Sequence, residues 1–278
     1  MKNASERLMR IVFFLSALAS VCAVVLICVF LLANAFPAFR EIGLGRFLFG
    51  THWAPQDEPP AFGILPMIIG SLYITAGAVI VGVPVGLLTA VFLSKVCPKR
   101  LYRLLKPGVQ LLAGIPSVVY GFFGMAALLP LFGSSMLSAS LLLGIMILPT
   151  VITLTESALN AVPESYYEGA VALGAGHFRA VFAVLLPAAK SGALAAVVLG
   201  IGRAIGETMA VIMVAGSQPR IPTSLLQGVR TLTSNIVLEM GYAQGLHREA
   251  LIATGVVLFV FILLMNLGFS ALKKGEKS

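Results

Sequence analysis

The sequence predicts an all-α membrane protein with six transmembrane helices and both termini in the cytoplasm. Apolar residues make up 59% of the 278 residues, only 11% are charged, and the mean hydropathy is +1.00. A soluble domain would have about 25% charged residues. Six apolar runs are long enough to cross a bilayer, which takes about 20 helical residues. These runs are continuous and lack the period-two alternation of transmembrane strands, so helices are favoured.

The six runs cover residues 11–36, 65–94, 107–132, 136–160, 184–215 and 250–272. The first run follows basic residues, and Ala33-Asn34-Ala35 near its end resembles the cleavage site of a secretory signal. Its apolar stretch is far longer than the roughly 7–15 residues of a signal's apolar core. We therefore expect an uncleaved helix. The predicted organisation is an N-terminal helix with its loop (1–64) and a core transmembrane domain (65–278).

Basic residues in the connecting loops predict the orientation. One set of segments is rich in them: Lys2, Arg7, Arg10, Lys95, Lys99, Arg100, Arg103, Lys106, Arg179, Lys190, Lys273, Lys274 and Lys277. The opposite loops carry only Arg40, Arg46, Arg220, Arg230 and Arg248. The first set contains both termini, so we expect these in the cytoplasm. The net charge of +8 is thus largely a topology signal and does not indicate nucleic-acid binding.

Two charges fall inside the fifth run, in the stretch GRAIGETMAVIMVAG (202–216): Arg203 and Glu207. A guanidinium at bilayer depth costs from about 3 to more than 10 kcal/mol, depending on the reference state. On a continuous helix the two side chains share a face. One interpretation is an internal ion pair, although Arg ahead of Glu is the less favourable order. The other is that Arg203 faces a translocation path.

Sequence motifs exclude other chemistry. The chain has no G-x4-G-K-[ST] phosphate loop, so we expect no ATP site. It has no Cys/His cluster with metal-ligand spacing, so we expect no metal and no other cofactor. Helix-borne serines lack a base at the same depth, and we expect no enzyme activity. Energy for uphill transport would therefore come from another subunit.

The segment between the fourth and fifth runs predicts a short helix outside the membrane. Pro163 and Glu164 suit a helix start, and Gly174 ends it after about three turns. Tyr166 and Tyr167 near that start are suitable anchors for a partner's pocket. Two interpretations stay open from these residues alone. The helix docks on another protein, or it rests on lipid headgroups.

A family resemblance bears on this choice. Glu168-Gly169-Ala170, three residues, Gly174, nine residues and Val184-Leu185-Leu186-Pro187 resemble the EAA loop of ABC-transporter permeases, E-A-A-x3-G-x9-I-x-L-P. The chain departs from it at Gly169 and Val184. The resemblance implies a coupling helix near 163–180 that docks on an ATPase subunit. The implied coupling residues are Glu164, Tyr166, Tyr167, Glu168, Gly169, Ala170, Gly174, Leu186 and Pro187.

Two further stretches narrow the resemblance: AGIPSVVYGFFG (113–124) resembles the third helix of phosphate-specific permeases, and GRAIGETMAV (202–211) resembles the fifth helix of those of the PstC type. The resemblance covers roughly residues 8–270. It implies a phosphate importer in a bacterial or archaeal inner membrane. The implied partners are a PstA-like permease, a PstB-like ATPase dimer and a PstS-like phosphate-binding protein. Rival interpretations are a sulfate or molybdate permease and, from another class, an ion-coupled secondary transporter that uses Glu207 as its carrier.

The charges at membrane depth suggest roles for single residues in such an importer. Arg203 would offer its planar donors to phosphate oxygens, a geometry that Lys does not match. Glu207 would hold Arg203, or a basic residue of the partner permease, while the path is empty. Thr208 would add a hydroxyl to the same substrate path. Residues 38–63 and 217–249 would face the binding protein or simply be solvated loops. We interpret Glu156 as a surface acid.

Overall fold

The computed structural model describes residues 2–275, and the side chains of residues 6–269. Its longer helices are α1 (Lys2–Ala38), α3 (Leu65–Val91), α4 (Lys99–Gly114), α5 (Ser117–Ala127), α7 (Met136–Asn160), α8 (Glu164–Ala172), α11 (Lys190–Gly206), α13 (Leu232–Glu239) and α14 (Gly245–Gly275). Its shorter helices are α2 (Leu44–Phe49), α6 (Leu129–Phe132), α9 (His177–Ala180), α10 (Leu186–Ala188) and α12 (Met209–Val214).

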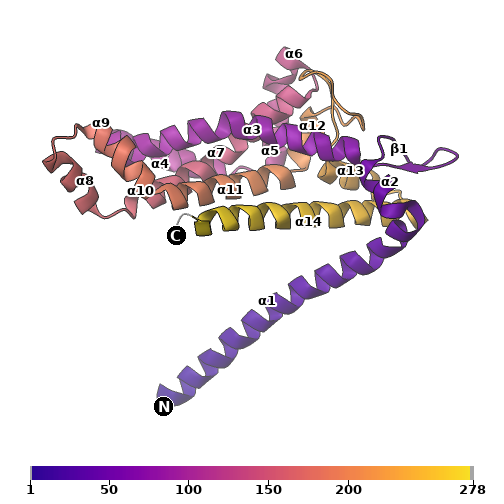
Figure 1. Ribbon diagram of the computed structural model, residues 1–278, viewed down its shortest axis with the longest axis horizontal. Helices are drawn as coiled ribbons and strands as arrows, with labels where there is room; N and C mark the ends of the chain where they lie inside the picture. The colour runs from indigo at the N-terminus through magenta and orange to yellow at the C-terminus, as the bar shows by residue number, and fades with distance from the viewer. Residues whose placement is uncertain (1, 276–278) are drawn as a thin grey trace.

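Three π-helical turns join some of these helices: η1 (Phe39–Gly43), η2 (Phe92–Val96) and η3 (Val181–Leu185). Strands β1 (Trp53–Ala54) and β2 (Ala61–Phe62) form a small antiparallel hairpin. Figure 1 shows that the bundle has two ends. We call the end with α8, α9 and α10 the α8 end. We call the opposite end, with β1, β2, α2 and α13, the hairpin end.

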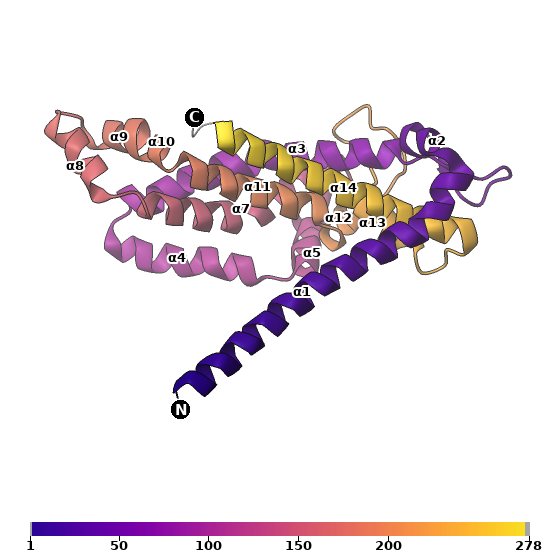
Figure 2. The ribbon, with the colours of Figure 1, turned by 60° about the horizontal axis from the view of Figure 1, so that its bottom comes forward.

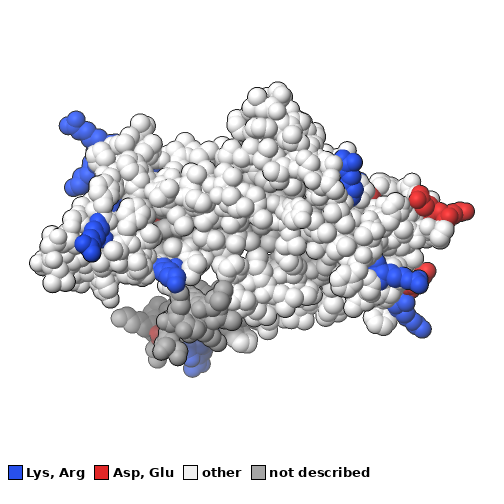
Figure 3. Space-filling model, turned by 45° about the horizontal axis from the view of Figure 1, so that its top comes forward, with Lys and Arg blue, Asp and Glu red and all other residues white. Residues whose placement is uncertain are grey.

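The structure confirms an all-α membrane protein. Four helices of the described chain are long and apolar enough to span a bilayer: Glu6–Phe49, Leu65–Val96, Met136–Asn160 and Gly245–Phe269. Two bent helix pairs raise the number of spans to six if each pair counts as one. Figure 3 shows a white belt across the middle of one face, with Lys and Arg displaced from it toward the two ends. Such a charge-free belt fits the hydrocarbon core.

Helices α3 and α7 form the centre of the bundle. They approach closely because glycines lie between them. A Cβ added to Gly82 would lie 2.6 Å from the carbonyl oxygen of Gly144, and one added to Gly86 would lie 2.7 Å from Cγ1 of Val151. Helices in lipid gain little from the hydrophobic effect, so close packing through small residues holds them together. These glycines therefore place the two central spans backbone to backbone.

Helix α1 lies largely outside this bundle. Figures 1 and 2 show its N-terminal half far from the other helices and its C-terminal end beside the start of α14. Ala35 and Ala38 are fully buried at that contact. Along the rest of the helix, apolar residues such as Phe13 and Val24 are exposed. This surface suits contact with lipid or with another membrane subunit.

Two of the predicted spans are not single straight helices. Within residues 107–132, α4 and α5 differ in direction by 100°. Pro116 explains this bend, because proline lacks an N–H and disfavours a helical conformation in the preceding residue. Ile115 accordingly has an extended ψ of 127°. Within residues 184–215, the chain bends by 70° at Ala189 and the helix breaks again at Glu207 and Thr208.

The interpretation of Glu156 as a surface acid is wrong. Its side chain lies on α7 and the residue is only 2% exposed. The Tyr102 hydroxyl donates to Oε1 at 2.7 Å, and Lys106 forms an ion pair with Oε2 at 2.5 Å. Both partners lie on α4. A carboxylate buried with a paired cation is stable where an isolated one would not be, so this pair ties α4 to the central helix.

Candidate functional site

The site is built where the fifth predicted span breaks. Helix α11 ends at Gly206, Glu207 is extended with a ψ of 134°, and α12 begins at Met209. The prediction that Arg203 and Glu207 share one helical face is therefore wrong. Among the described residues, no ion pair or side-chain hydrogen bond joins the two.

Each of the two charges lies instead at a helix end that suits it. Arg203 is in the last turn of α11, where unpaired carbonyl groups make the helix end negative. Glu207 precedes α12, and its Oε1 accepts a hydrogen bond from the Ala210 N–H at 3.4 Å. The positive end of α12 therefore stabilises the carboxylate. The break explains how one apolar run holds both charges without pairing them.

Side-chain hydroxyl groups bind the backbone carbonyl groups that have no helical hydrogen bond at the break. The Thr233 hydroxyl donates to the Glu207 carbonyl at 3.0 Å, and the Thr208 hydroxyl donates to the Gly206 carbonyl at 3.3 Å. Non-helical backbone at membrane depth is tolerated where it is buried in protein or lines a water-filled path. Gly206 and Met209 are exposed at the break, while Arg203 and Glu207 are half-buried. The segment thus presents a guanidinium, with no ion-pair partner among the described side chains, beside an open face.

The two irregular spans pack against each other. A Cβ added to Gly121 of α5 would lie 2.3 Å from the sulfur of Met213, and one added to Gly124 would lie 2.7 Å from Cγ1 of Val214. Tyr120 of α5 is buried, and its hydroxyl donates to the Leu112 carbonyl across the bend between α4 and α5. Both breaks therefore belong to one region.

A second candidate site is the helix at the α8 end. The sequence places the start of this helix correctly, since α8 begins at Glu164 directly after Pro163. Gly174 ends it with a φ of +84°. The Ala175 N–H donates to the Ala170 carbonyl at 3.0 Å, and the Gly174 N–H donates to the Val171 carbonyl at 2.8 Å. This pair of hydrogen bonds needs a left-handed residue, which explains the glycine of the signature.

The predicted coupling residues divide between two faces of this segment. Tyr167, Ala170 and Leu186 face inward, and the Tyr167 hydroxyl lies 2.9 Å from Nδ1 of His177. The outward-facing residues include Glu164, Tyr166, Glu168, Gly169 and Pro187. Sequence reasoning missed two further exposed apolar side chains, Leu173 at 91% and Phe178 at 63% exposure. The sequence did hold a signal for them, because apolar residues flank Gly174 and Gly176, the two glycines that follow α8.

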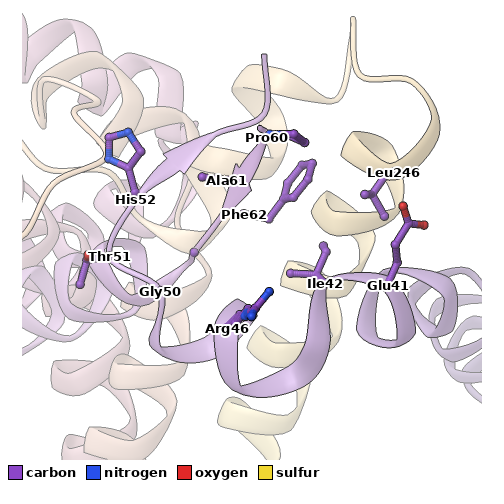
Figure 4. Close-up of a pocket in the computed structure, with 11 residues that line it drawn as sticks. Glu41, Ile42, Arg46, Gly50, Thr51, His52, Pro60, Ala61, Phe62 and Leu246 are labelled. Atoms are coloured by element: carbon purple, nitrogen blue, oxygen red, sulfur yellow. The ribbon is translucent and has the colours of Figure 1, made fainter. Parts of the chain in front are cut away.

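The hairpin end holds a cavity of about 430 Å³ between η1, α2 and the β hairpin. Figure 4 shows the side chains of Phe62 and, below it, Ile42 lining this cavity, with Arg46 at its lower side. The surrounding loop closes tightly, because a Cβ added to Gly50 would lie 2.7 Å from the Cα of Gly63. Residues 38–63 therefore form an ordered platform.

Comparisons with known proteins agree with this architecture. Residues 82–277 match the family described as "Binding-protein-dependent transport system inner membrane component". A probable ABC transporter permease protein, YqgH of Bacillus subtilis, is 36% identical over 92% of this chain and 88% of its own length. The phosphate transport system permease protein PstC of Mesorhizobium japonicum is 33% identical over 84% of this chain and 80% of its own length. PstC 2 of Mycobacterium tuberculosis is 32% identical over 98% and 92%.

Solved structures show the same fold at low identity. A chain of the inward-facing MetNI methionine ABC transporter has a TM-score of 0.65 at 20% identity and covers 76% of this chain and 95% of its own length. A chain of a bacterial alginate ABC transporter has a TM-score of 0.64 at 16% identity and covers 92% of both. The family match and the curated relatives show that this chain belongs to the inner membrane components of binding-protein-dependent transport systems, the multi-pass ABC permeases of the cytoplasmic membrane.

Proposed function

We propose that this chain is the permease subunit of an ATP-driven phosphate importer. One observation carries the proposal: Arg203 is charged, half-buried and without an ion pair among the described residues, at a helix break inside a membrane span. Such a guanidinium binds oxyanions well, because its planar donors match two oxygens at once. The PstC proteins at 31–33% identity support phosphate as that oxyanion.

Glu207 takes a different role from the one expected. Because its carboxylate is bound by the start of α12, it leaves the charge of Arg203 available to the substrate. We assign Glu207 to fixing the geometry of the break. Thr208 donates to the Gly206 carbonyl and acts in the same way. Arg203 is then the residue that contacts phosphate.

The α8 end is the proposed contact with the ATPase. The family implies a second permease, an ATPase and a binding protein as partners. Leu173, Phe178 and Tyr166 project from the α8 end as apolar anchors for a groove on that ATPase. In this assignment both termini lie in the cytoplasm, as the basic loops indicate. The partners would be PstA-like, PstB-like and PstS-like proteins, and the hairpin end would face the binding protein.

The proposal is tested by uptake of radiolabelled phosphate into proteoliposomes that hold the complete importer and its binding protein. The variables are ATP inside the vesicles, a collapsed ion gradient, and excess sulfate or molybdate. We expect uptake that requires ATP, survives loss of the gradient and ignores both competing anions. Inhibition by sulfate or molybdate would assign a different oxyanion. Uptake that needs the gradient and no ATP would instead make the chain a secondary transporter.

A further inference from the structure

Helix α13 at the hairpin end is short, buried and polar, which calls for an explanation. Four of its eight residues are among the buried polar side chains of the chain: Thr233, Ser234, Asn235 and Glu239. Burying polar groups is costly unless hydrogen bonds satisfy them. All four side chains are hydrogen-bonded, although Nδ2 of Asn235 has no partner among the described residues. The contacts at the two ends of α13 show what this network connects.

At its C-terminal end, Glu239 is 7% exposed and collects groups from separate segments. Its Oε1 accepts from Arg230 at 2.5 Å. Its Oε2 accepts from the Trp53 indole N–H at 2.9 Å and lies 2.9 Å from Nε2 of His247. Trp53 belongs to the β hairpin and His247 to α14. One carboxylate thus joins the β hairpin of the platform to α14 and to the segment before α13.

Arg230 extends this network to the loop after α12. Its Nε donates to the Ser217 carbonyl at 3.0 Å, and Nη1 donates to Asn235 at 3.0 Å. Gly216 and Val229 lie side by side at the base of that loop. The two ends of the loop therefore lie together, and Arg230 links them to α13 through its hydrogen bonds to Ser217 and Asn235.

At its N-terminal end, α13 reaches the break in the fifth span. Thr231 caps the helix by accepting from the Ser234 N–H, and Ser71 of α3 accepts from the Leu232 N–H at 3.0 Å. Thr233, in the first turn, donates to the carbonyl of Glu207. Eight helical residues span about 12 Å. A single rigid element thus has the hairpin-end platform at one end and the Glu207 break at the other.

We infer that α13 transmits the state of the hairpin-end platform to the break beside Arg203, with Glu239 and Thr233 as its two positioning residues. A cavity of about 290 Å³ lined by Trp53, Asp57, Tyr242 and Glu239 lets a docking protein reach the network. This inference rests on the proposed function in one respect: the docking protein is taken to be the solute-binding protein of the importer. It requires no particular substrate.

The test reports on the break directly. Gly206 is exposed and an added Cβ there meets nothing within 4 Å, so Gly206→Cys introduces a reporter thiol without strain. Cys22, Cys28 and Cys97 are first replaced by Ser, since they are the free cysteines of the described chain. The rate at which a membrane-impermeant maleimide labels the introduced thiol is then measured in the assembled complex in nanodiscs.

We expect Glu239→Gln and Thr233→Val each to change this rate about fivefold in the same direction, and the double variant to change it no further. Glu249→Gln is the control, because Glu249 lies two residues after His247 and outside the network. Should Glu239→Gln fail to assemble, Trp53→Phe removes one donor while keeping an aromatic ring, and it should shift the rate in the same direction.

Labelling at the parent rate in Thr233→Val and in an assembled Glu239 or Trp53 variant would overturn the inference, as would independent effects that multiply in the double variant. The outcome is separate from that of the uptake assay. A labelling change without phosphate uptake by the parent importer would leave the role of α13 intact and remove phosphate as the substrate.

Discussion

The α3–α7 pair and the break between α11 and α12 are held together by opposite means. Along α3 and α7, glycines bring two backbones into contact. At the break, the start of α12 binds the Glu207 carboxylate, and the Thr233 hydroxyl binds the Glu207 carbonyl. Met209, beside the break, is 46% exposed. A close-packed interface resists displacement, whereas a segment with few buried contacts opens at low cost. We therefore propose that α3 and α7 form the static frame and that the break, where Gly206 and Met209 are exposed between buried neighbours, is the part that moves.

The largest effect is expected from crowding the static frame. Gly82→Leu would drive a side chain into the Gly144 backbone and should destabilise the chain by about 3 kcal/mol or more. Gly108→Leu is the matched control, since an added Cβ at Gly108 meets nothing within 4 Å. Thermal unfolding in detergent measures both variants. Equal stability of the two would show that α3 and α7 are not in close contact.

Removing the guanidinium should act on transport and leave the frame intact. Arg203→Ala should lower phosphate uptake about 10- to 100-fold, because a hydrogen bond to a charged group is worth about 1.5–3 kcal/mol. Arg203→Lys keeps the charge without the planar donors and should lie between Ala and the parent. Arg100→Ala, an exposed arginine of α4, controls for net charge. Parent-level uptake by assembled Arg203→Ala would remove Arg203 from the substrate path.

A moderate effect is expected at the α8 end. Leu173→Asp should weaken binding of the ATPase subunit about 5- to 30-fold, as loss of a central apolar anchor costs ~1–2 kcal/mol. Because Leu173 is almost fully exposed, folding should not change. Titration of the purified ATPase onto the permease in nanodiscs measures this, with Lys99→Gln as the control. Undiminished binding would move the contact away from Leu173.

The smallest effect is expected for Glu207→Gln. The amide oxygen still accepts from the Ala210 N–H, and only the attraction between charge and helix end is lost, at ~0.3–1 kcal/mol. Uptake should therefore fall about two- to fivefold while assembly stays normal. Uptake equal to that of the parent would show that the charge itself is dispensable.

The sequence predicts features that depend on neighbouring residues. Apolar run length places the spans, and Pro163 and Gly174 place α8, because a proline start and a left-handed glycine are local requirements. The burial of Glu156 depends on Lys106, 50 residues earlier, and was missed. The break at Glu207 depends on Thr233, 26 residues later, and was missed for the same reason.

The same holds for the candidate sites: features set by neighbouring residues are predicted, and features set by distant segments are missed. Run length and residue type single out Arg203 and Glu207, but their separation by a break requires the positions of α12 and α13. In the Glu239 network, the hydrogen bond between Trp53 and Glu239 joins residues 186 positions apart in the chain. No local pattern signals such a contact, so sequence reasoning treats its members as loop residues.

The most direct test of the break is a double-mutant cycle on Arg203 and Glu207. Unfolding free energies are measured for Arg203→Ala, Glu207→Gln, the double variant and the parent in the same detergent. Charges held by separate helix ends should give effects that add to within about 0.5 kcal/mol. A coupling energy of about 1–3 kcal/mol would show that the two side chains form an ion pair on a continuous helix, contrary to this account.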